Sequence, residues 1–397
     1  MTPPHPPSAP VPVLFVLTDL RVGGMERKVA EIVQKMDRTR CRPVVACLKE
    51  AGPLAPEVQE SGVRVYSNLI AAKWDVRVLV RLLRIIRSEG IQVVCTVGDG
   101  GDRMFWGRLA ARIAGVAGIV STHHSTRNPS GDSIIDRPNR WLMPWNDAYV
   151  AVAQSAADYL VEHEGLPRDR TVVIYNGVDL SKYTGDGREE ARKSLEIPPD
   201  TPVIAHVAAF RIEKAHDILL RAARKVVDAV PETRFLLVGD GETRGEIEKL
   251  RAELDLELNA LLLGRRSDIP EILAASDLFV LCSRAMVETF PNSVLEAMAS
   301  RRPPVCTNVG SIAEQITDGQ NGYLVDEEDW ETLADRILTL VRDPSLRMQM
   351  GEDAHRVVSQ NFSAERMVRD REDLFTSLAM GNGIPSRLYS SKAEEGS

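Results

Sequence analysis

Two glutamates in one short segment are well suited to binding a ligand that carries hydroxyl groups. Glu288 and Glu296 lie in CSRAMVETFPNSVLEAMAS (282–300), which begins at the end of the apolar run DLFVL, a predicted buried strand. Eight residues separate them, and on a single helix this spacing would leave their side chains about 80° apart. Because proline favours the first turn of a helix, a helix is predicted to begin near Pro291. Glu288 then lies in the loop before the helix, and Glu296 lies in its second turn.

The start of this predicted helix offers a second kind of binding group. The free N–H groups of a helix N-terminus favour an anion such as a phosphate, and Asn292 and Ser293 are the expected donors. Carboxylates in turn accept hydrogen bonds from sugar hydroxyls. The alternative is an ordinary amphipathic helix with surface glutamates, and the spacing alone does not separate the two.

Two cations stand at the start of the second half of the chain. Arg211 and Lys214 follow the apolar run PVIAHVAAF (202–210), and cations in that place could neutralise a leaving diphosphate. Solvated surface charge is the alternative.

In the first half, Gly23 and Gly24 follow VPVLFVLT (11–18) and would let the backbone approach a diphosphate or an acceptor. A plain tight turn is the alternative. His123 and His124 end another predicted strand, where a hydrogen-bonded structural histidine is the alternative to a functional one.

The elements that must position these residues follow one pattern. Continuous apolar runs predict buried parallel strands, and they alternate with helical segments in both halves of the chain. Besides those already named, the runs are IQVVCTVG, GIVSTHH, DAYVAVA and TVVIYNG in the first half, and RFLLVGD, LNALLLG and PPVCTN in the second. The segment 181–202, with glycine, aspartate and paired prolines, predicts the linker. Ligands bind outside the carboxyl ends of such strands, so the 19–26 and 210–216 loops are expected to face each other across a cleft.

Composition restricts the class of protein. The 397 residues carry a net charge of −8, so no nucleic-acid partner is expected. The five cysteines form no C-x-x-C pair and are expected to be buried thiols in a reducing compartment. No apolar run reaches the roughly 18 residues of a membrane span. No D-x-D motif or zinc spacing occurs, so no metal site is expected.

One predicted helix and one glycine motif could each have a further function. The segment 73–90 predicts a basic amphipathic helix that could lie on an anionic membrane with Trp74, or could be a packed helix with a solvated outer face. Gly239, Gly241 and Gly245 approach the dinucleotide fingerprint of a nicotinamide-dependent dehydrogenase, but the third glycine is one residue late.

The motifs together resemble the family 4 glycosyltransferases, which are retaining enzymes of the GT-B fold that use nucleotide sugars. The resemblance spans about residues 12–380 and rests on E-x7-E with its EAMA continuation and on the following segments: GGMERKVAEI, STHHS, YNGVDLSKY, FRIEKAHDILLRAA, VGDGETR, LLGRRSDIPEILAASDLFVL, PPVCTNVGSIAE and DGQNGYLV.

The resemblance implies roles for residues of the second half. Glu288 would contact the hydroxyls of the donor sugar, and Glu296 would hold the ribose hydroxyls. The segment Thr289–Ser293, which includes Phe290, would supply N–H groups near the diphosphate, although Thr289 stands where the family usually has glycine. Lys214 and Arg211 would neutralise the diphosphate, and Lys214 is preferred to Arg211. The match departs from the family at two points, since the R-x-x-K spacing is short and Ala215 stands where glycine is usual.

Other implied roles lie on both halves. Gly239 and Arg265 are assigned to donor binding, and Gly23 and Gly24 to the diphosphate or acceptor loop. His124 fits the family histidine better than His123. It would position groups near the donor sugar, since a leaving phosphate can itself take the acceptor's proton.

The expected architecture is therefore α/β of the GT-B type, with two Rossmann-like parallel-sheet domains facing across a cleft. Its expected parts are as follows: 1–10 a disordered leader, 11–183 the acceptor domain, 184–360 the nucleotide-sugar donor domain, 361–380 a helix crossing back to the first domain, and 381–397 a disordered tail.

The expected activity is transfer of a hexose or N-acetylhexosamine from a UDP- or GDP-linked donor to a hydroxyl of a glycan, glycolipid or lipid-linked precursor. The resemblance implies retention and no metal or other cofactor. The expected location is cytoplasmic, or peripheral at the inner membrane face. A GT-B-like epimerase, a non-catalytic sugar-nucleotide binder and, remotely, the dehydrogenase are the alternatives.

Overall fold

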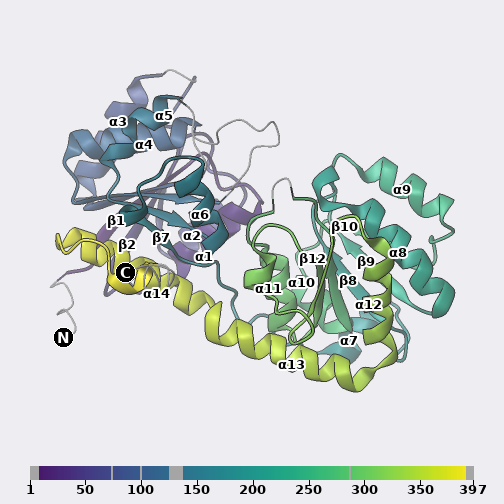
Figure 1. Cartoon of the computed structure of the whole chain (residues 1–397). Helices are drawn as coiled ribbons and strands as arrows, with labels where there is room; N and C mark the ends of the chain where they lie inside the picture. Colours follow the sequence, from purple (N-terminus) through teal and green to yellow (C-terminus); the bar gives the residue numbers. More distant parts are fainter. Residues whose placement is uncertain (1–8, 73–74, 99–100, 125–136, 286–287, 390–397) are drawn as a thin grey trace. The chain divides into compact units, whose positions relative to one another are not determined.

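The chain divides into two compact domains in the computed structural model (Figure 1), which describes residues 9–72, 75–98, 101–124, 137–285 and 288–389. The first domain comprises the residues up to Asn176 and those from Ala364 onward, and the second comprises Gly177–Ser363. The division therefore falls seven residues before the expected boundary at 183/184. The shift arises because Val178 pairs with Ser363 and donates its N–H to the carbonyl of Phe362, so the chain after Asn176 already belongs to the second domain.

The first domain is built on a sheet of seven parallel strands in the order β3-β2-β1-β4-β5-β6-β7. The order reverses between β1 and β4, as in doubly wound nucleotide-binding folds. The strands are β1 (Val11–Leu17), β2 (Cys41–Cys47), β3 (Arg64–Tyr66), β4 (Val93–Val97), β5 (Gly118–His123), β6 (Ala148–Ala151) and β7 (Thr171–Val173).

Alternate side chains of these strands fill two separate cores. Phe15 of β1 belongs to the core shared with α1 (Gly24–Lys35), α2 (Ala55–Glu60) and α14 (Ala364–Ala379). Its neighbours Leu14 and Val16 belong to the core on the opposite face, under α3 (Arg77–Ser88) and α4 (Gly101–Ala114). This arrangement follows from the two-residue side-chain period of a strand. The remaining helices of this domain are α5 (Arg137–Leu142) and α6 (Gln154–Glu162).

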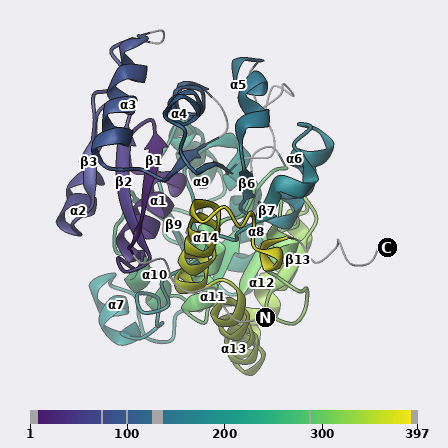
Figure 2. The same ribbon diagram turned by 90° about the vertical axis from the view of Figure 1, so that its left-hand side faces the viewer.

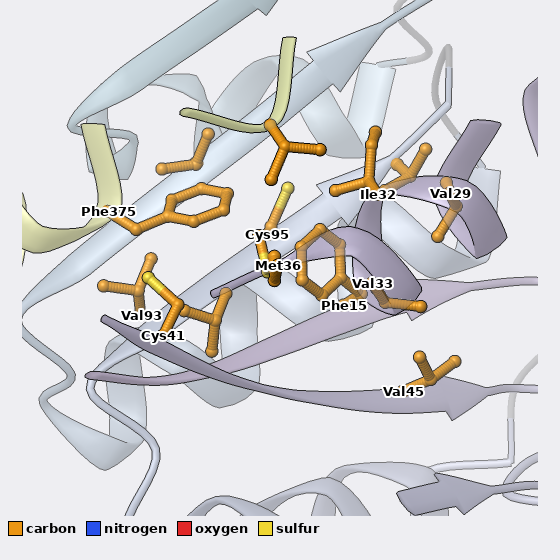
Figure 3. Packing of buried hydrophobic residues seen from close by; sticks show 14 of the residues in the cluster. Phe15, Val29, Ile32, Val33, Met36, Cys41, Val45, Val93, Cys95 and Phe375 are labelled. Carbon is orange, nitrogen blue, oxygen red and sulfur yellow. The ribbon is translucent and has the colours of Figure 1, made fainter. Parts of the chain in front are cut away.

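The C-terminal helix α14 is part of the first domain (Figures 1 and 2). Phe375 packs edge-to-face on Phe15, with ring centroids 5.8 Å apart (Figure 3). Glu372 accepts a hydrogen bond from the N–H of Asp37 at 2.6 Å and pairs with Arg40 at 3.0 Å. This is the segment for which the sequence implied a return to the first domain.

The second domain has a sheet of six parallel strands in the order β10-β9-β8-β11-β12-β13. Apolar residues of α8 (His216–Ala229) and α12 (Trp330–Arg342) share one core with three strands of this sheet. The strands are β8 (Val203–Val207), β9 (Arg234–Val238), β10 (Ala260–Gly264), β11 (Leu278–Leu281), β12 (Pro304–Thr307) and β13 (Tyr323–Val325). The helices are α7 (Arg188–Ser194), α8 (His216–Ala229), α9 (Arg244–Glu253), α10 (Ile269–Ala275), α11 (Asn292–Ala299), α12 (Trp330–Arg342) and α13 (Pro344–Asn361).

Two parallel-sheet Rossmann-like domains confirm the predicted fold class. The chain after residue 380 departs from the expected disordered tail, because residues 381–389 are ordered. Leu388 is buried, Arg387 pairs with Asp370 at 2.5 Å, and the Tyr389 hydroxyl donates to the carbonyl of Asp169 at 2.9 Å. The rest of the expected tail and the leader up to residue 8 lie outside the described residues.

The basic helix α3 packs in the first domain through Val78, Leu82, Ile85 and Ile86, which are buried. The apolar side chains of α3 thus pack in the core, as expected if it is a packed helix with a solvated outer face. Contact of this helix with a membrane stays a prediction. Trp74 lies outside the described residues. Among the described residues no helix is both long and apolar enough to cross a membrane.

Candidate active site

An ion pair joins two sequence-predicted residues of the second domain that lie 74 positions apart in the chain. Lys214 closes the short 3-10 turn Ile212–Lys214 after β8, and its Nζ contacts Oε2 of Glu288. The Glu288 side chain is only 7% exposed, whereas Lys214 is 23% exposed. The turn between β8 and α8 and the loop before α11 therefore place a lysine and a carboxylate side by side.

The Glu288 carboxylate has a second donor. Ser283, which lies just after β11, donates its hydroxyl to Oε2 of Glu288 at 2.8 Å. Ser283 is itself buried, and its N–H donates to the hydroxyl of Thr307 at 2.8 Å. An ionised carboxylate needs such partners when it leaves water. Sequence reasoning missed Ser283, although it stands in the same segment.

The loop that carries Glu288 is held by a close backbone approach. Gly310 has φ +59°, and a Cβ atom there would lie 2.1 Å from the carbonyl oxygen of Glu288. The N–H of Ser311 donates to the carbonyl of Thr289 at 3.0 Å. The buried amide of Gln315 donates to the carbonyl of Pro291 at 3.3 Å. The segment after β12 thus fixes the backbone on which the carboxylate depends.

Helix α11 begins at Asn292, directly after Pro291, close to the predicted start. Thr289 is 5% exposed, and its hydroxyl has no hydrogen-bond partner among the described residues. The Oδ1 atom of Asn292 is likewise buried without a partner within the described part of the chain. Buried polar atoms of this kind call for an explanation, and a ligand at the start of α11 would supply one. Ser293 and Glu296 are half-buried on the same helix, and Phe290 packs against Phe362 with centroids 5.4 Å apart.

Arg211 is not beside Glu288 in this structure. Its Nε pairs with Glu213 at 2.9 Å, and its side chain is 55% exposed. Of these two cations, Lys214 is therefore the one that pairs with Glu288. The backbone at Ala215 is left-handed, with φ +41°, which explains why glycine is the residue expected there.

Two buried histidines lie beneath this turn. His206 of β8 contacts the carbonyl of Val280 at 2.9 Å through Nδ1, and its ring meets His216 edge-on at 4.8 Å. Burial lowers the pKa of His206 to about 4 and that of His216 to about 2, and Lys214 adds to both shifts. Both rings are therefore neutral, so they support the turn without competing with Lys214 for an anion.

Gly239 and Arg265 lie at the ends of β9 and β10. A Cβ at Gly239 would lie 1.8 Å from the carbonyl oxygen of Ala208, and one at Gly241 would lie 2.2 Å from that of Phe210. Backbone packing alone thus explains both glycines, without the dinucleotide that the fingerprint suggested. Arg265 is exposed, and a donor-binding role for it stays a prediction.

The remaining predicted residues belong to the first domain. Gly23 caps helix α1, Gly24 is its first residue, and the carboxylate of Glu26 lies over Gly23. His124 follows β5, and burial, with the charges of Arg371 and Arg103, lowers its pKa to about 3. His124 is therefore a neutral imidazole near pH 7, suited to positioning groups.

No cluster of three or more histidine, cysteine, aspartate or glutamate side chains suited to a metal occurs in the described part of the chain.

Comparisons with known proteins agree with this fold. Residues 22–182 match the family model described as Glycosyltransferase Family 4, and residues 187–357 match that of Glycosyl transferases group 1. The chain is 31% identical to the N-acetyl-alpha-D-glucosaminyl L-malate synthase of Bacillus anthracis over 264 residues, which is 65% of this chain and 67% of that protein. It is 26% identical to the UDP-Gal:alpha-D-GlcNAc-diphosphoundecaprenol alpha-1,3-galactosyltransferase of Escherichia coli, covering 84% and 88%.

Among solved structures, HepE of Anabaena in complex with UDP and glucose is similar, with a TM-score of 0.79 and 22% identity, covering 92% of this chain and 99% of that one. A glycosyltransferase from Rickettsia africae gives the same TM-score at 20% identity, covering 93% and 98%. The chain therefore belongs to glycosyltransferase family 4 and is a glycosyltransferase of the GT-B fold. The dehydrogenase alternative finds no support in these matches.

Proposed function

We propose that this enzyme transfers a sugar from a nucleotide-diphosphate donor to an acceptor hydroxyl, with retention at the anomeric carbon and without a metal ion. The observation that carries the proposal is the Lys214–Glu288 pair beside the start of α11. It places a cation for a diphosphate next to a carboxylate for sugar hydroxyls.

The second domain supplies the groups for the donor. Lys214 stabilises the negative charge that grows on the diphosphate as the sugar leaves, aided by the N–H groups at the start of α11. Glu288 accepts hydrogen bonds from the donor sugar, and Glu296 accepts those of the ribose. Thr289 and Asn292 lie nearby with buried polar atoms that lack partners among the described residues. Removing one such charge stabiliser typically lowers kcat by about 10²–10³.

Retention needs no protein base in this account. The leaving phosphate takes the proton of the acceptor hydroxyl as that hydroxyl attacks from the same face of the sugar. His124 in the first domain then positions groups, which fits a ring whose pKa is lowered to about 3 by burial. Gly23 and Gly24 form the loop proposed to meet the diphosphate or the acceptor.

UDP is the proposed nucleotide of the donor, with GDP as the alternative. The E. coli relative is named for UDP-galactose, and the Anabaena structure holds UDP. A glycan or lipid-linked acceptor is proposed from the diphosphoundecaprenol substrate in the name of the E. coli relative. The five cysteines are buried and unpaired, which fits action in a reducing compartment such as the cytoplasm.

Release of nucleoside diphosphate tests the proposal. UDP- and GDP-sugars are incubated with the enzyme in excess EDTA, with and without candidate acceptors. Acceptor-stimulated release in EDTA is expected. Activity abolished by EDTA and restored by Mn²⁺ or Mg²⁺ would refute the metal-free mechanism. Epimerised donor without nucleotide release would indicate an epimerase. Binding of the nucleotide sugar without any turnover would indicate a non-catalytic sugar-nucleotide binder.

A further inference from the structure

The guanidinium of Arg103, in α4, lies where the first sheet reverses its strand order. Nε donates to the carbonyl of Val97 at 2.8 Å, and Nη1 donates to the hydroxyl of Thr18 at 3.0 Å. Val97 is the last residue of β4, and Thr18 directly follows β1. Arg103 therefore bridges the carboxyl ends of the two strands between which ligands of open parallel sheets bind.

The backbone leaves room for this guanidinium. Gly98 has φ +123°, and a Cβ there would lie 2.2 Å from Nε and 2.3 Å from Nη2 of Arg103. Any side chain at Gly98 would thus displace the arginine. The guanidinium is held from two sides and over a glycine, so it is oriented before any ligand arrives.

The described residues use only part of the hydrogen-bonding capacity of Arg103. Its two hydrogen-bond acceptors are a carbonyl and a hydroxyl, and no carboxylate of the described chain forms an ion pair with it. Glu26, the carboxylate over the start of α1, pairs with Arg21 at 3.9 Å and interacts with the charge of Arg103 without forming an ion pair with it. A guanidinium has five N–H donors, so Arg103 keeps donors for a further acceptor. A partly buried cation of this kind favours an anion.

A second guanidinium adds positive potential to the same part of the domain. Arg371 of α14 is 2% exposed, its Nη1 donates to the carbonyl of Met367 at 3.1 Å, and its buried Nη2 has no partner among the described residues. Burial is the main cause of the lowered pKa of His124, the residue after β5, and the charges of Arg371 and Arg103 both add to it. Two cations thus act on the carboxyl edge of this sheet.

We propose that Arg103 binds an anionic group, a phosphate or a carboxylate, on the acceptor. The inference rests on the proposed glycosyl transfer, in which the donor diphosphate already has Lys214 in the second domain. The planar fork of Arg103 suits two oxygens of one phosphate or carboxylate. The acceptor is accordingly an anionic molecule, and the first domain binds its charged group through Arg103.

Calorimetric titration of the full-length protein tests this inference. The probes are methyl phosphate and succinate, with methyl glucoside as the neutral probe, each added with and without saturating UDP or GDP. The variants are Arg103→Gln and Thr18→Val, which keeps the charge but removes the hydroxyl that holds Nη1. Arg112→Gln is the matched control, because Arg112 is an exposed arginine on the same helix. Thermal unfolding of each variant shows whether it is folded.

Wild type is expected to bind at least one anionic probe more tightly than the neutral probe. Arg103→Gln should weaken that binding at least about tenfold, the effect of losing a hydrogen bond to a charged group. Thr18→Val should weaken it less, and Arg112→Gln should leave it within about twofold. Equal anion binding by wild type and Arg103→Gln, or no anion binding by wild type, would overturn the inference.

Nucleotide affinity separates this inference from the proposed function. UDP or GDP should bind Arg103→Gln as tightly as wild type. If Arg103→Gln instead weakens nucleotide binding, Arg103 belongs to the donor diphosphate and the acceptor inference is wrong. If neither nucleotide binds wild type, the proposed function fails, whatever the anion titration shows.

Discussion

Replacing Gly310 by alanine should damage catalysis far more than folding. The added Cβ would lie 2.1 Å from the carbonyl oxygen of Glu288, more than 1 Å closer than ordinary contact. Because the obstructing atom is backbone, the Glu288–Thr289 peptide must move by about 1 Å. The hydrogen bond from Ser311 to Thr289, now 3.0 Å long, must change with it. The carboxylate proposed to meet the donor sugar moves as a result.

The magnitude follows from two separate effects. Alanine at φ +59° pays the left-handed backbone cost of about 1–2 kcal/mol. Misplacing a positioning group by about 1 Å can lower turnover about 10²-fold. Gly310→Ala should therefore lose about 10²-fold in kcat while the free energy of unfolding falls by only about 1–3 kcal/mol.

Gly319→Ala is the matched control. Gly319 has φ +73°, but a Cβ there would meet nothing within 4 Å. Alanine at this position therefore has the same left-handed backbone cost, but its Cβ does not contact Glu288. Donor turnover and urea unfolding are measured for both variants. If kcat of Gly310→Ala equals that of Gly319→Ala, the link between Gly310 and the Glu288 loop is wrong.

Three further predictions concern the second domain. Lys214→Ala should lower kcat by about 10²–10³ in a donor-turnover assay, and a variant within about twofold of wild type would move the role to Arg211 or to α11 alone. Glu296→Gln should weaken nucleotide binding by about 1.5–3 kcal/mol in calorimetry, and unchanged affinity for the bare nucleotide would contradict the ribose assignment. His216 has a pKa lowered to about 2, so the unfolded chain takes up a proton that the folded chain does not, and stability is lost as pH falls below about 6.5. His216→Leu should reduce that pH slope by about 1.4 kcal/mol per pH unit between about pH 6 and pH 5 in urea unfolding; identical slopes would refute the argument.

The pattern of apolar residues in the sequence was enough to predict most of the strands of both sheets. Each predicted apolar run contains one of the strands, because strands buried on both faces are continuously apolar. The strands that the pattern missed are β2, interrupted by Pro43, and the three-residue strands β3 and β13. Short strands carry too few residues to show a period. Residues 381–389 were missed for a different reason: Arg387 anchors them through ion pairs with Asp370 and Asp373, which no apolar pattern records.

The candidate site was predictable in its residues but not in its contacts. The E-x7-E segment and Pro291 located Glu288 before the helix and Glu296 within it. The pairing of Lys214 with Glu288 joins residues 74 positions apart, and only the fold brings them together. The support from Ser283 and Gly310 also depends on how β11 and β12 end beside each other. Spacing along a chain does not contain that information.

Our central proposal is that Lys214 and Glu296 hold the nucleotide of the donor, while Glu288 lies beside Lys214 to meet the donor sugar. A crystal structure of the protein with the nucleoside diphosphate that binds it tests this most directly. We expect the β-phosphate against Lys214 and the N–H groups at the start of α11, and the ribose hydroxyls on Glu296. A nucleotide bound with its diphosphate away from Lys214 and its ribose away from Glu296 would contradict the account.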